Sequence, residues 1–401
     1  MTMKLATRAT RIAPSPTLNM AASVKRMVAQ GEKIIDFSAG EPAFETPEFI
    51  RDAAIAAIRE GFTHYTPVTG IDELKEAILD KCLADHGLRY EKSQVLVSCG
   101  AKHALYNLAQ VLLEEGDEVI LPTPYWVSYP DQIALAGART VLLPTEEVHE
   151  YAIDPEALEA RITPRTKAII LNSPGNPTGA VYSRRILEEI ATLALRYNLL
   201  IVSDEIYERM VYDKREHVSI ASLAPEVQAR TVLVNGVSKT YAMTGWRIGY
   251  AVGPTDLIAA MGHLQSQSTS NPTSIAQKAA VAALRGDQSV VQEMVRALDD
   301  RRQCMVKRLQ AIPGVQCPVP GGAFYAFPNI SELIGRRHAN GTIANPSDLV
   351  AYLLSKAGIA CVPGEPFGST SHIRLSYTPD VPCIEEGMDR FEAAVKALME
   401  A

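Results

Sequence analysis

The sequence predicts an α/β protein in which a large domain has a mostly parallel mixed sheet between helices and a smaller α+β domain accompanies it. Between about residues 94 and 254, short apolar runs alternate with helical patterns, as in proteins with parallel sheets. Polar residues follow these runs directly, at the strand ends where open α/β sheets bind ligands. After Thr273 long amphipathic helices dominate, which indicates a second domain.

The expected elements follow in chain order from helical spacing of apolar residues and from short apolar runs. Residues 1–30 form a basic arm with a short helical pattern, and a strand at 34–37 leads into the turn Gly40-Glu41-Pro42. We expect helices near 47–60, 71–85, from 101 onwards, 183–197, 273–285, 288–311, 346–357 and 382–399. We expect strands at 94–97, 118–121, 168–171, 199–202, 232–234, 248–252, 322–327 and 372–376. The expected domains are 1–48 (arm and part of the small domain), 49–285 (large) and 286–401 (small).

Composition excludes several classes of protein. A net charge of −7 without a basic tract argues against nucleic-acid binding. No run approaches about 18 apolar residues, so we expect no membrane span. The six cysteines are scattered without a Cys-x-x-Cys pair, which favours a reduced cytoplasmic protein, and we expect no metal site. The N-terminal arm is basic, but it lacks an apolar segment and we do not read it as a targeting peptide.

The stretch 232–254 carries the main chemical signal. Lys239 lies in a small-residue turn after one apolar run, and Arg247 precedes the next. Desolvation and nearby cations favour the neutral, carbonyl-reactive form of such a lysine, and an arginine can bind a phosphate with two hydrogen bonds. Together they suggest a carbonyl cofactor with a phosphate group, pyridoxal 5′-phosphate (PLP). Taken alone, each residue would be read as an ordinary surface charge.

Other strand ends offer partners for such a cofactor, and each also has a plainer explanation. Gly100 before a helix leaves the N–H groups of Ala101 and Lys102 free for a phosphate, although many such turns bind none. Asp204 ends a buried run, so it either pairs with a cation such as a pyridinium N–H or caps a turn. Arg374 alternates with apolar residues, so it either binds a carboxylate or lies on an exposed edge.

Three further side chains can contact the cofactor ring. Tyr207 and the amide of Asn176 can reach its phenolic oxygen. Trp126 offers a flat face for stacking, although it is equally consistent with a core residue.

Taken together, these segments resemble the class I aminotransferases of the PLP fold-type I superfamily, aspartate aminotransferases in particular. The resemblance extends from about residue 14 to the end of the chain. It rests on the order and spacing of Tyr65…Gly70, Gly100-Ala101-Lys102, Pro124-Tyr125-Trp126, Asn176-Pro177-Thr178-Gly179, Asp204-Glu205-Ile206-Tyr207, Ser238-Lys239…Arg247 and Arg374.

The resemblance implies a homodimer with active sites at the subunit interface, and it implies a role for each residue. Lys239 would bond covalently to PLP and move the reacting proton, while Asp204 would hold the pyridine nitrogen. The remaining roles are phenolic-oxygen contacts (Tyr207, Asn176), phosphate contacts (Arg247, Ser238, the amides of Ala101 and Lys102, and Tyr65 of the partner subunit), ring stacking (Trp126) and binding of the substrate carboxylate (Gly40, Arg374). The implied reaction moves the amino group of aspartate or glutamate to 2-oxoglutarate or oxaloacetate in a ping-pong cycle.

Two positions depart from the family pattern. Gly236 stands where many members have a phosphate-binding serine. Arg247 is the only arginine between Trp246 and Arg285, whereas aspartate aminotransferases of animals and enteric bacteria place another there for the distal carboxylate. Similarity to a bacterial subgroup assigns that task to Lys102, with a solvent-facing lysine as the alternative.

Prephenate is left open as a further substrate. Thr17 matches a threonine of members that transaminate prephenate, but Ala13 stands where those members often have a basic residue. A C–S β-lyase or an aromatic or broad-specificity aminotransferase of the same fold is also left open. The effector module of a PLP-fold transcription regulator is disfavoured, because an arm of about 30 residues cannot hold a helix-turn-helix domain.

Overall fold

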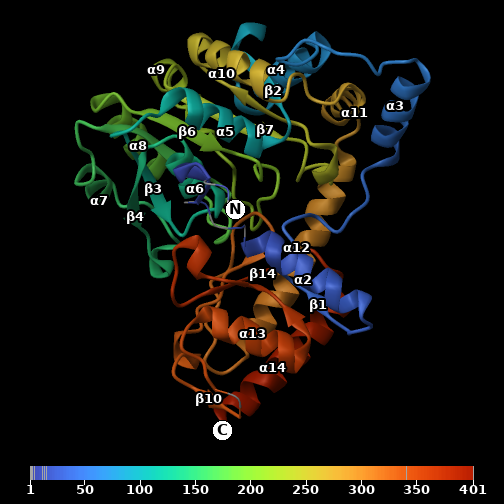
Figure 1. Ribbon diagram of the computed structural model, residues 1–401, viewed down its shortest axis with the longest axis vertical. Helices are drawn as coiled ribbons and strands as arrows, with labels where there is room; N and C mark the ends of the chain where they lie inside the picture. Colours follow the sequence, from blue (N-terminus) through green and yellow to red (C-terminus); the bar gives the residue numbers. More distant parts are fainter. Residues whose placement is uncertain are drawn as a thin grey trace.

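The computed structural model describes residues 3, 5–10, 12, 14, 16–339 and 341–400. The upper part of Figure 1 is built on a seven-stranded sheet, in which every strand is parallel to the others except β8, antiparallel to both of its neighbours. The predicted mixed, mostly parallel sheet is confirmed. In spatial order its strands are β2 (Val95–Ser98), β8 (Gly249–Val252), β7 (Thr231–Gly236), β6 (Leu200–Asp204), β5 (Thr166–Asn172), β3 (Glu118–Thr123) and β4 (Arg139–Pro144).

Helices cover both faces of this sheet, which explains why its strands are continuous apolar runs in the sequence. In β5, Ala168 and Ile170 pack on one face, and Ile169 and Leu171 pack on the other. The first face is covered by α5 (Ala101–Leu112), α6 (Ser128–Leu135) and α10 (Thr255–Ser268). The second face is covered by α7 (Pro155–Glu159), α8 (Arg184–Arg196), α9 (Pro225–Gln228), α3 (Glu48–Arg59), α4 (Asp72–His86) and α11 (Ser274–Arg285).

A second core lies in the lower part of Figure 1. Its long helices are α12 (Ser289–Gln310), α13 (Pro346–Ala357) and α14 (Val381–Met399). Its strands are the antiparallel set β13 (Val362–Pro363), β14 (Ile373–Ser376) and β9 (Tyr325–Ala326), and the parallel pair β1 (Ile35–Asp36) and β12 (Ile359–Ala360). Ile206 and Tyr207 also pack in this core, so the chain after β6 joins the two parts. We propose that the two parts correspond to the domains 49–285 and 286–401, with residues before 49 contributing to the second.

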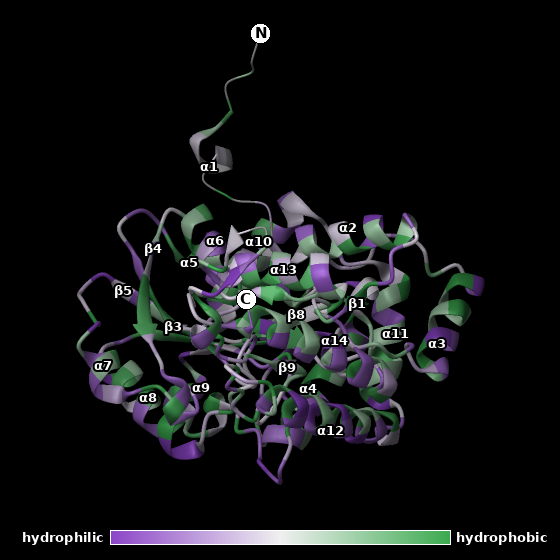
Figure 2. Ribbon diagram, turned by 90° about the horizontal axis from the view of Figure 1, so that it is seen from below, coloured by the Kyte–Doolittle hydropathy of each residue, from purple (hydrophilic) through white to green (hydrophobic). Residues whose placement is uncertain are grey.

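The remaining elements are short or peripheral. Figure 2 shows α1 standing apart from the rest of the chain. The helices and strands not yet named are α1 (Thr7–Thr10), α2 (Pro16–Ala29), β10 (Arg337–His338) and β11 (Gly341–Thr342), with 3₁₀ turns at Lys92–Gln94, Glu147–His149, Ile220–Ser222, Thr244–Trp246, Ser331–Leu333 and Glu365–Phe367. Among the described residues, every helix is too short or too polar to cross a bilayer.

Several elements were not predicted from the sequence. Strand β4 is an edge strand whose residues are mostly exposed or half-buried, so its apolar pattern is weak. Helix α6 includes Pro130, and α10 ends in the polar run Gln265–Ser268, so neither has a strong helical signal. Helix α2 extends over Pro16–Ala29, which is longer than the short pattern expected there.

Candidate active site

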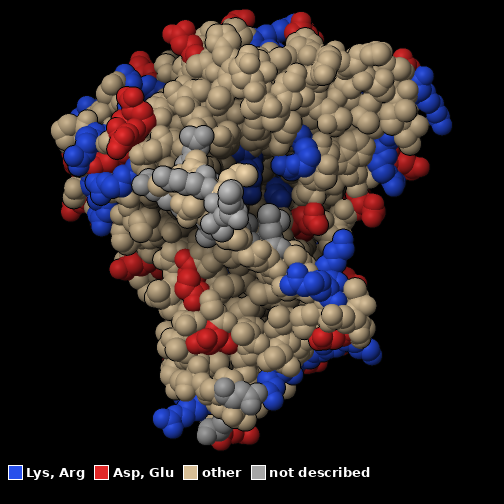
Figure 3. Space-filling view, viewed as in Figure 1, with Lys and Arg blue, Asp and Glu red and all other residues tan. Residues whose placement is uncertain are grey.

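A cavity of about 470 Å³ lies where the carboxyl ends of the parallel strands face the second core. Figure 3 shows this hollow, with Lys and Arg atoms deep inside it. Every predicted site residue except Tyr65 lines the cavity: Thr17, Gly40, Ala101, Lys102, Trp126, Asn176, Asp204, Tyr207, Ser238, Lys239, Arg247 and Arg374. The Tyr65 side chain is instead 90% exposed. Ala13 lies outside the described residues.

One end of the cavity has the features of an anion site. Helix α5 begins at Ala101, so the N–H groups of its first turn have no partners within the helix. Arg247 lies beside them, where its guanidinium donates to the carbonyls of Thr244 (2.9 Å) and Cys99 (3.1 Å). A Cβ atom at Gly100 would lie 2.4 Å from Nη2 of Arg247, so glycine is required for this close approach. The arrangement can hold a phosphate through backbone N–H groups and one arginine.

The amine of Lys239 lies between this anion site and the second core. Its Nζ donates to the backbone carbonyl of Gly40 at 2.6 Å. Burial lowers the pKa of Lys239 from 10.5 to about 8. The nearby Glu41 acts to raise this pKa, whereas the positive charges of Arg247 and Arg374 act to lower it. A large fraction of this amine is therefore neutral near pH 8, as a nucleophile or a base requires.

Asp204 ends β6 as a buried carboxylate without a cationic partner at hydrogen-bond distance among the described residues. Its Oδ2 accepts from the hydroxyl of Tyr129 at 2.8 Å, and its Oδ1 accepts from the backbone N–H of Ile206 at 3.2 Å. Burial raises the pKa of Asp204 to about 6 despite these two bonds. A cationic N–H in the cavity would compensate this buried charge, which fits a protonated pyridine nitrogen.

Arg374 forms a second anion site at the opposite wall. It is 2% exposed, and its Nη atoms donate to Oδ1 of Asn176 (3.1 Å) and to the carbonyl of Ser38 (2.8 Å). Its guanidinium lies over the ring of Tyr325, 4.5 Å from the centroid. Nε of Arg374 has no hydrogen-bond partner among the described residues. A buried arginine whose contacts are all to neutral groups is suited to binding a small carboxylate.

Lys102 adds a third positive charge to the cavity. Its Nζ lies 4.9 Å from the centroid of the Trp126 ring. No ion pair joins Lys102 to an acidic side chain in the part of the chain that the structure describes. Burial and the neighbouring Arg247 lower the pKa of Lys102. Both effects disfavour its charged form, so binding an anion there would be favourable.

Tyr129 and Tyr325 are among the cavity residues that the sequence did not single out. The hydroxyl of Tyr325 lies 2.9 Å from that of Tyr207, and Tyr129 holds Asp204 as described. Tyr129 follows Trp126 by three residues on the unpredicted helix α6, and Tyr325 lies in an expected strand whose polar residue was not considered. Recognising α6 would have placed Tyr129 in the cavity.

The donor set fits PLP at both ends. Cationic and N–H groups gather around Arg247, and the Asp204 carboxylate and the Lys239 amine line the same cavity. The phosphate, the pyridine nitrogen and the aldehyde of PLP require these three kinds of group.

Comparison with known proteins agrees with this arrangement. A family model of class I and II aminotransferases matches residues 32–391. An aspartate aminotransferase of Geobacillus stearothermophilus is 50% identical over 98% of this chain and its own full length. An aspartate/prephenate aminotransferase of Nitrosomonas europaea is 45% identical over 97% of this chain and 98% of the relative.

Solved structures lead to the same family. The aspartate aminotransferase of Rhizobium meliloti superimposes with a TM-score of 0.94 at 42% identity, covering 99% of this chain and 100% of its own. That of Thermus thermophilus with maleate gives 0.93 at 39% identity, covering 98% and 100%. Since the family model and these relatives span almost the whole chain, the protein belongs to the class I and II aminotransferases, which depend on PLP.

Proposed function

We propose that the protein transfers the amino group of aspartate or glutamate to 2-oxoglutarate or oxaloacetate, and that it also accepts prephenate. The observation that carries the preference for dicarboxylic substrates is the presence of two cations, Arg374 and Lys102, in the cavity that holds the Lys239 amine. The names of the relatives in Geobacillus and Nitrosomonas support both substrate classes. Thr17, which lines the same cavity, is the candidate contact for prephenate.

Each side chain has a distinct task in this proposal. When bound, PLP supplies an aldehyde that accepts the amino group and a ring that withdraws electrons. Arg374 binds the α-carboxylate through its unpartnered Nε, and Lys102 binds the distal carboxylate. Asp204 holds a proton on the pyridine nitrogen, which its buried charge favours.

The remaining residues position the cofactor and move the proton. Tyr207 and Asn176 donate to the phenolic oxygen, and Trp126 packs on the ring face. Arg247, Ser238 and the first N–H groups of α5 hold the phosphate. The amine of Lys239 takes the proton from the substrate Cα as a general base. It then donates this proton, as a general acid, to the carbon that was the aldehyde carbon of the cofactor. Its lowered pKa keeps it able to do both near neutral pH.

We propose a cytoplasmic homodimer. The side chains of Tyr65 (90%), Met3 (86%) and Leu5 (61%) are exposed and so are available for a subunit contact. All six cysteines are unpaired, which agrees with a reducing compartment. In the dimer, Tyr65 of the partner subunit would complete the phosphate site.

A half-reaction screen tests the proposal. The purified PLP form is mixed with aspartate, glutamate, phenylalanine, alanine or cystathionine in turn, and conversion to the pyridoxamine form is followed by absorbance. We expect aspartate and glutamate to convert it fastest. Release of pyruvate and ammonia from cystathionine, without amino transfer to 2-oxoglutarate, would identify a β-lyase instead. Transamination of prephenate by glutamate, weakened in Thr17→Val, tests the second substrate.

Replacement of Lys102 by Met tests the distal contact. Loss of one charge-assisted hydrogen bond costs about 1.5–3 kcal/mol, so kcat/KM for aspartate should fall about 10- to 100-fold. The value for alanine, which has no distal carboxylate, should change little. Equal losses for both amino acids would show that Lys102 supports the cofactor site rather than the distal carboxylate.

A further inference from the structure

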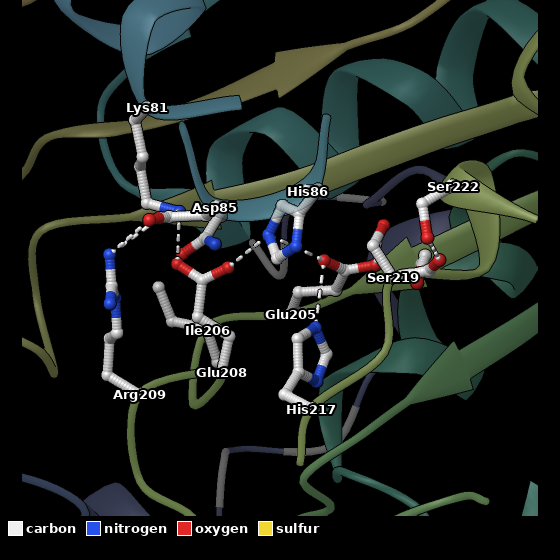
Figure 4. A network of polar contacts seen from close by, with 12 residues as sticks. Lys81, Asp85, His86, Glu205, Ile206, Glu208, Arg209, His217, Ser219 and Ser222 are labelled. Atoms are coloured by element: carbon white, nitrogen blue, oxygen red, sulfur yellow. Dashed lines mark hydrogen bonds and ion pairs between the residues drawn. The ribbon is translucent and has the colours of Figure 1, made fainter. Parts of the chain in front are cut away.

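The chain turn that carries Asp204 and Tyr207 is held from the side opposite the cavity. Asp204 and Tyr207 line the cavity, but Glu205 and Glu208 do not. Their carboxylates instead join Lys81 and His86 of α4, together with His217, in a buried group of contacts (Figure 4). We refer to these five residues as the acid–histidine cluster.

Glu205 is the member next to Asp204 in sequence, and it is 1% exposed. Its Oε2 lies 3.1 Å from Nε2 of His217 and 4.0 Å from Nε2 of His86. Its Oε1 accepts from the hydroxyls of Ser203 and Ser219, both at 2.8 Å. The Glu205 carboxylate is thus fixed in one orientation, directly behind the strand end that presents Asp204.

Glu208 anchors the same turn to α4. Its Oε2 lies 3.0 Å from Nε2 of His86, and its other oxygen pairs with Lys81. The next residue, Arg209, donates to Asp85 at 2.6 Å, and Asp85 lies 3.0 Å from Lys81. Figure 4 shows these side chains converging from α4 and from the turn.

The charges of this region do not balance unless a histidine is protonated. Glu205, Glu208 and Asp85 are negative, whereas only Lys81 and Arg209 carry a permanent positive charge. An uncompensated charge in a buried region is costly, so one proton on the histidine pair would restore neutrality. The other titratable groups facing the cluster, Cys82, Tyr90, Tyr241 and Tyr250, have pKa values raised by burial and stay neutral.

The direction of the pKa shifts agrees with this charge count. Burial acts to lower the pKa of His217, but Glu205 and Glu208 together outweigh it and the net shift is upward. Burial acts to raise the pKa of Glu205, but His217 and His86 outweigh it and the net shift is downward. Glu205 in turn is among the groups that raise the pKa of Asp204.

We propose that the acid–histidine cluster positions Asp204 and sets the electrostatic potential at the cofactor ring, with the Glu205 charge offset by one proton held on the His86–His217 pair. The inference rests on the proposed function, because Asp204 acts there on the pyridine nitrogen. Without the offsetting proton, the Glu205 charge would oppose ionisation of Asp204 and weaken its hold on that nitrogen. The five residues are therefore positioning residues that act through Asp204.

Two sets of substitutions, which change the local charge in opposite directions, test the proposal in the PLP-loaded enzyme. Glu205→Gln removes a negative charge, and the double variant His86→Gln/His217→Gln removes the site of the proton while retaining an N–H donor at each position. The bound cofactor changes its absorption when the bond between PLP and Lys239 loses a proton. The readout is the midpoint, the pH at which half of this absorption change has occurred. Removing a nearby negative charge should lower this midpoint, and removing a positive charge should raise it, each by about 0.3–1 pH unit.

Controls separate charge from packing. Asp85→Asn makes the same change of charge just outside the cluster, where Asp85 pairs with Lys81, and should shift the midpoint less than Glu205→Gln. The single variant His217→Gln should shift it upward by less than the double variant, and it serves if the double variant does not fold. PLP affinity and thermal unfolding of each variant are measured alongside.

The outcomes are distinct. Shifts of opposite sign support the proposal. Shifts of the same sign, or none, in variants that fold and bind PLP would overturn it and show that the cluster is structural only. Two histidines and two glutamates also suit zinc, so a stoichiometric metal in the purified protein that is lost in Glu205→Gln would overturn it as well. A wild-type protein without a cofactor band would instead refute the proposed function.

Discussion

The Lys239 amine is placed where its protonated form is least stable. Burial and the neighbouring arginines lower its pKa from 10.5 to about 8. In the apo protein below pH 8, folding therefore forces a charged lysine into an unfavourable site. Between pH 8 and about 10 the unfolded chain binds more protons than the folded chain, so the free energy of unfolding rises with pH over this window. Reactivity at this position is thus obtained at the expense of stability.

Replacement of Lys239 by Met in the apo protein should reveal this cost. Below pH 8 the variant should be more stable than the wild type by up to about 3 kcal/mol, because the difference between a pKa of 10.5 in the unfolded chain and about 8 in the folded chain corresponds to that amount. The gain should shrink as the pH rises from 8 to 10. Urea unfolding at pH 7 and pH 9.5 measures both values. Lys307→Met, on an exposed position of α12, should show no such pH dependence, and a constant gain for Lys239→Met would contradict the argument.

Sequence patterns brought out the residues at strand ends and missed those whose role depends on distant partners. Lys239, Asp204 and Arg247 follow or precede apolar runs, so their location near one sheet edge could be predicted. The bond between Tyr207 and Tyr325 joins residues 118 positions apart and leaves no local pattern. The acid–histidine cluster is similar, because His86 and Glu208 are 122 positions apart.

Two helices, α10 and α11, hold the segment before α4 through the buried side chains of Gln265 and Gln277. Gln265 on α10 is completely buried, and its amide donates to the carbonyls of Val68 and Val97, both at 2.8 Å. Its Oε1 accepts from Ser98 and Asn107. Since Ser98 ends β2 just before Gly100, one side chain connects the loop after Tyr65 with the start of the anion site.

Replacement of Gln265 by Leu should therefore weaken both folding and cofactor binding. The change leaves several buried polar groups unsatisfied, at about 1–3 kcal/mol each. We expect the free energy of unfolding to fall by about 2–5 kcal/mol and the dissociation constant for PLP to rise, measured by urea unfolding and by PLP titration of the apo protein. Gln267→Leu, exposed on the same helix, is the matched control. Unchanged PLP affinity in a destabilised Gln265→Leu would show that Gln265 serves packing alone.

The elements that could be predicted are those whose buried side chains follow a regular apolar spacing in the sequence. Strands covered on both faces and helices with strong amphipathic spacing were placed to within a few residues, as α13 at Pro346–Ala357 shows. The edge strand β4 and helix α10 were not, because β4 has few buried side chains and α10 buries Gln265 among its core residues. In α10 a polar side chain occupies a core position because four polar groups converge on it.

At the scale of the whole molecule, the position of Tyr65 stands out, because its side chain is 90% exposed and lies outside the cavity. Arg247, Ser238 and the start of α5 line one cavity, whereas the exposed Tyr65 does not. In the proposed symmetric dimer, each subunit would place Tyr65 in the cavity of the other. The buried glutamines then fix a loop that acts on the partner's site.

Hybrid dimers test this exchange of residues. Tyr65→Phe should weaken PLP binding about 10- to 100-fold, because it removes one hydrogen bond to a charged phosphate. Lys239→Ala should abolish transamination. In a hybrid of one Tyr65→Phe subunit and one Lys239→Ala subunit, one cavity receives an intact Lys239 from its own chain and an intact Tyr65 from the other. That cavity should bind PLP with wild-type affinity and be active, as measured on hybrids purified with two different tags. If the hybrid binds PLP no better than the Tyr65→Phe homodimer, Tyr65 does not act across the interface.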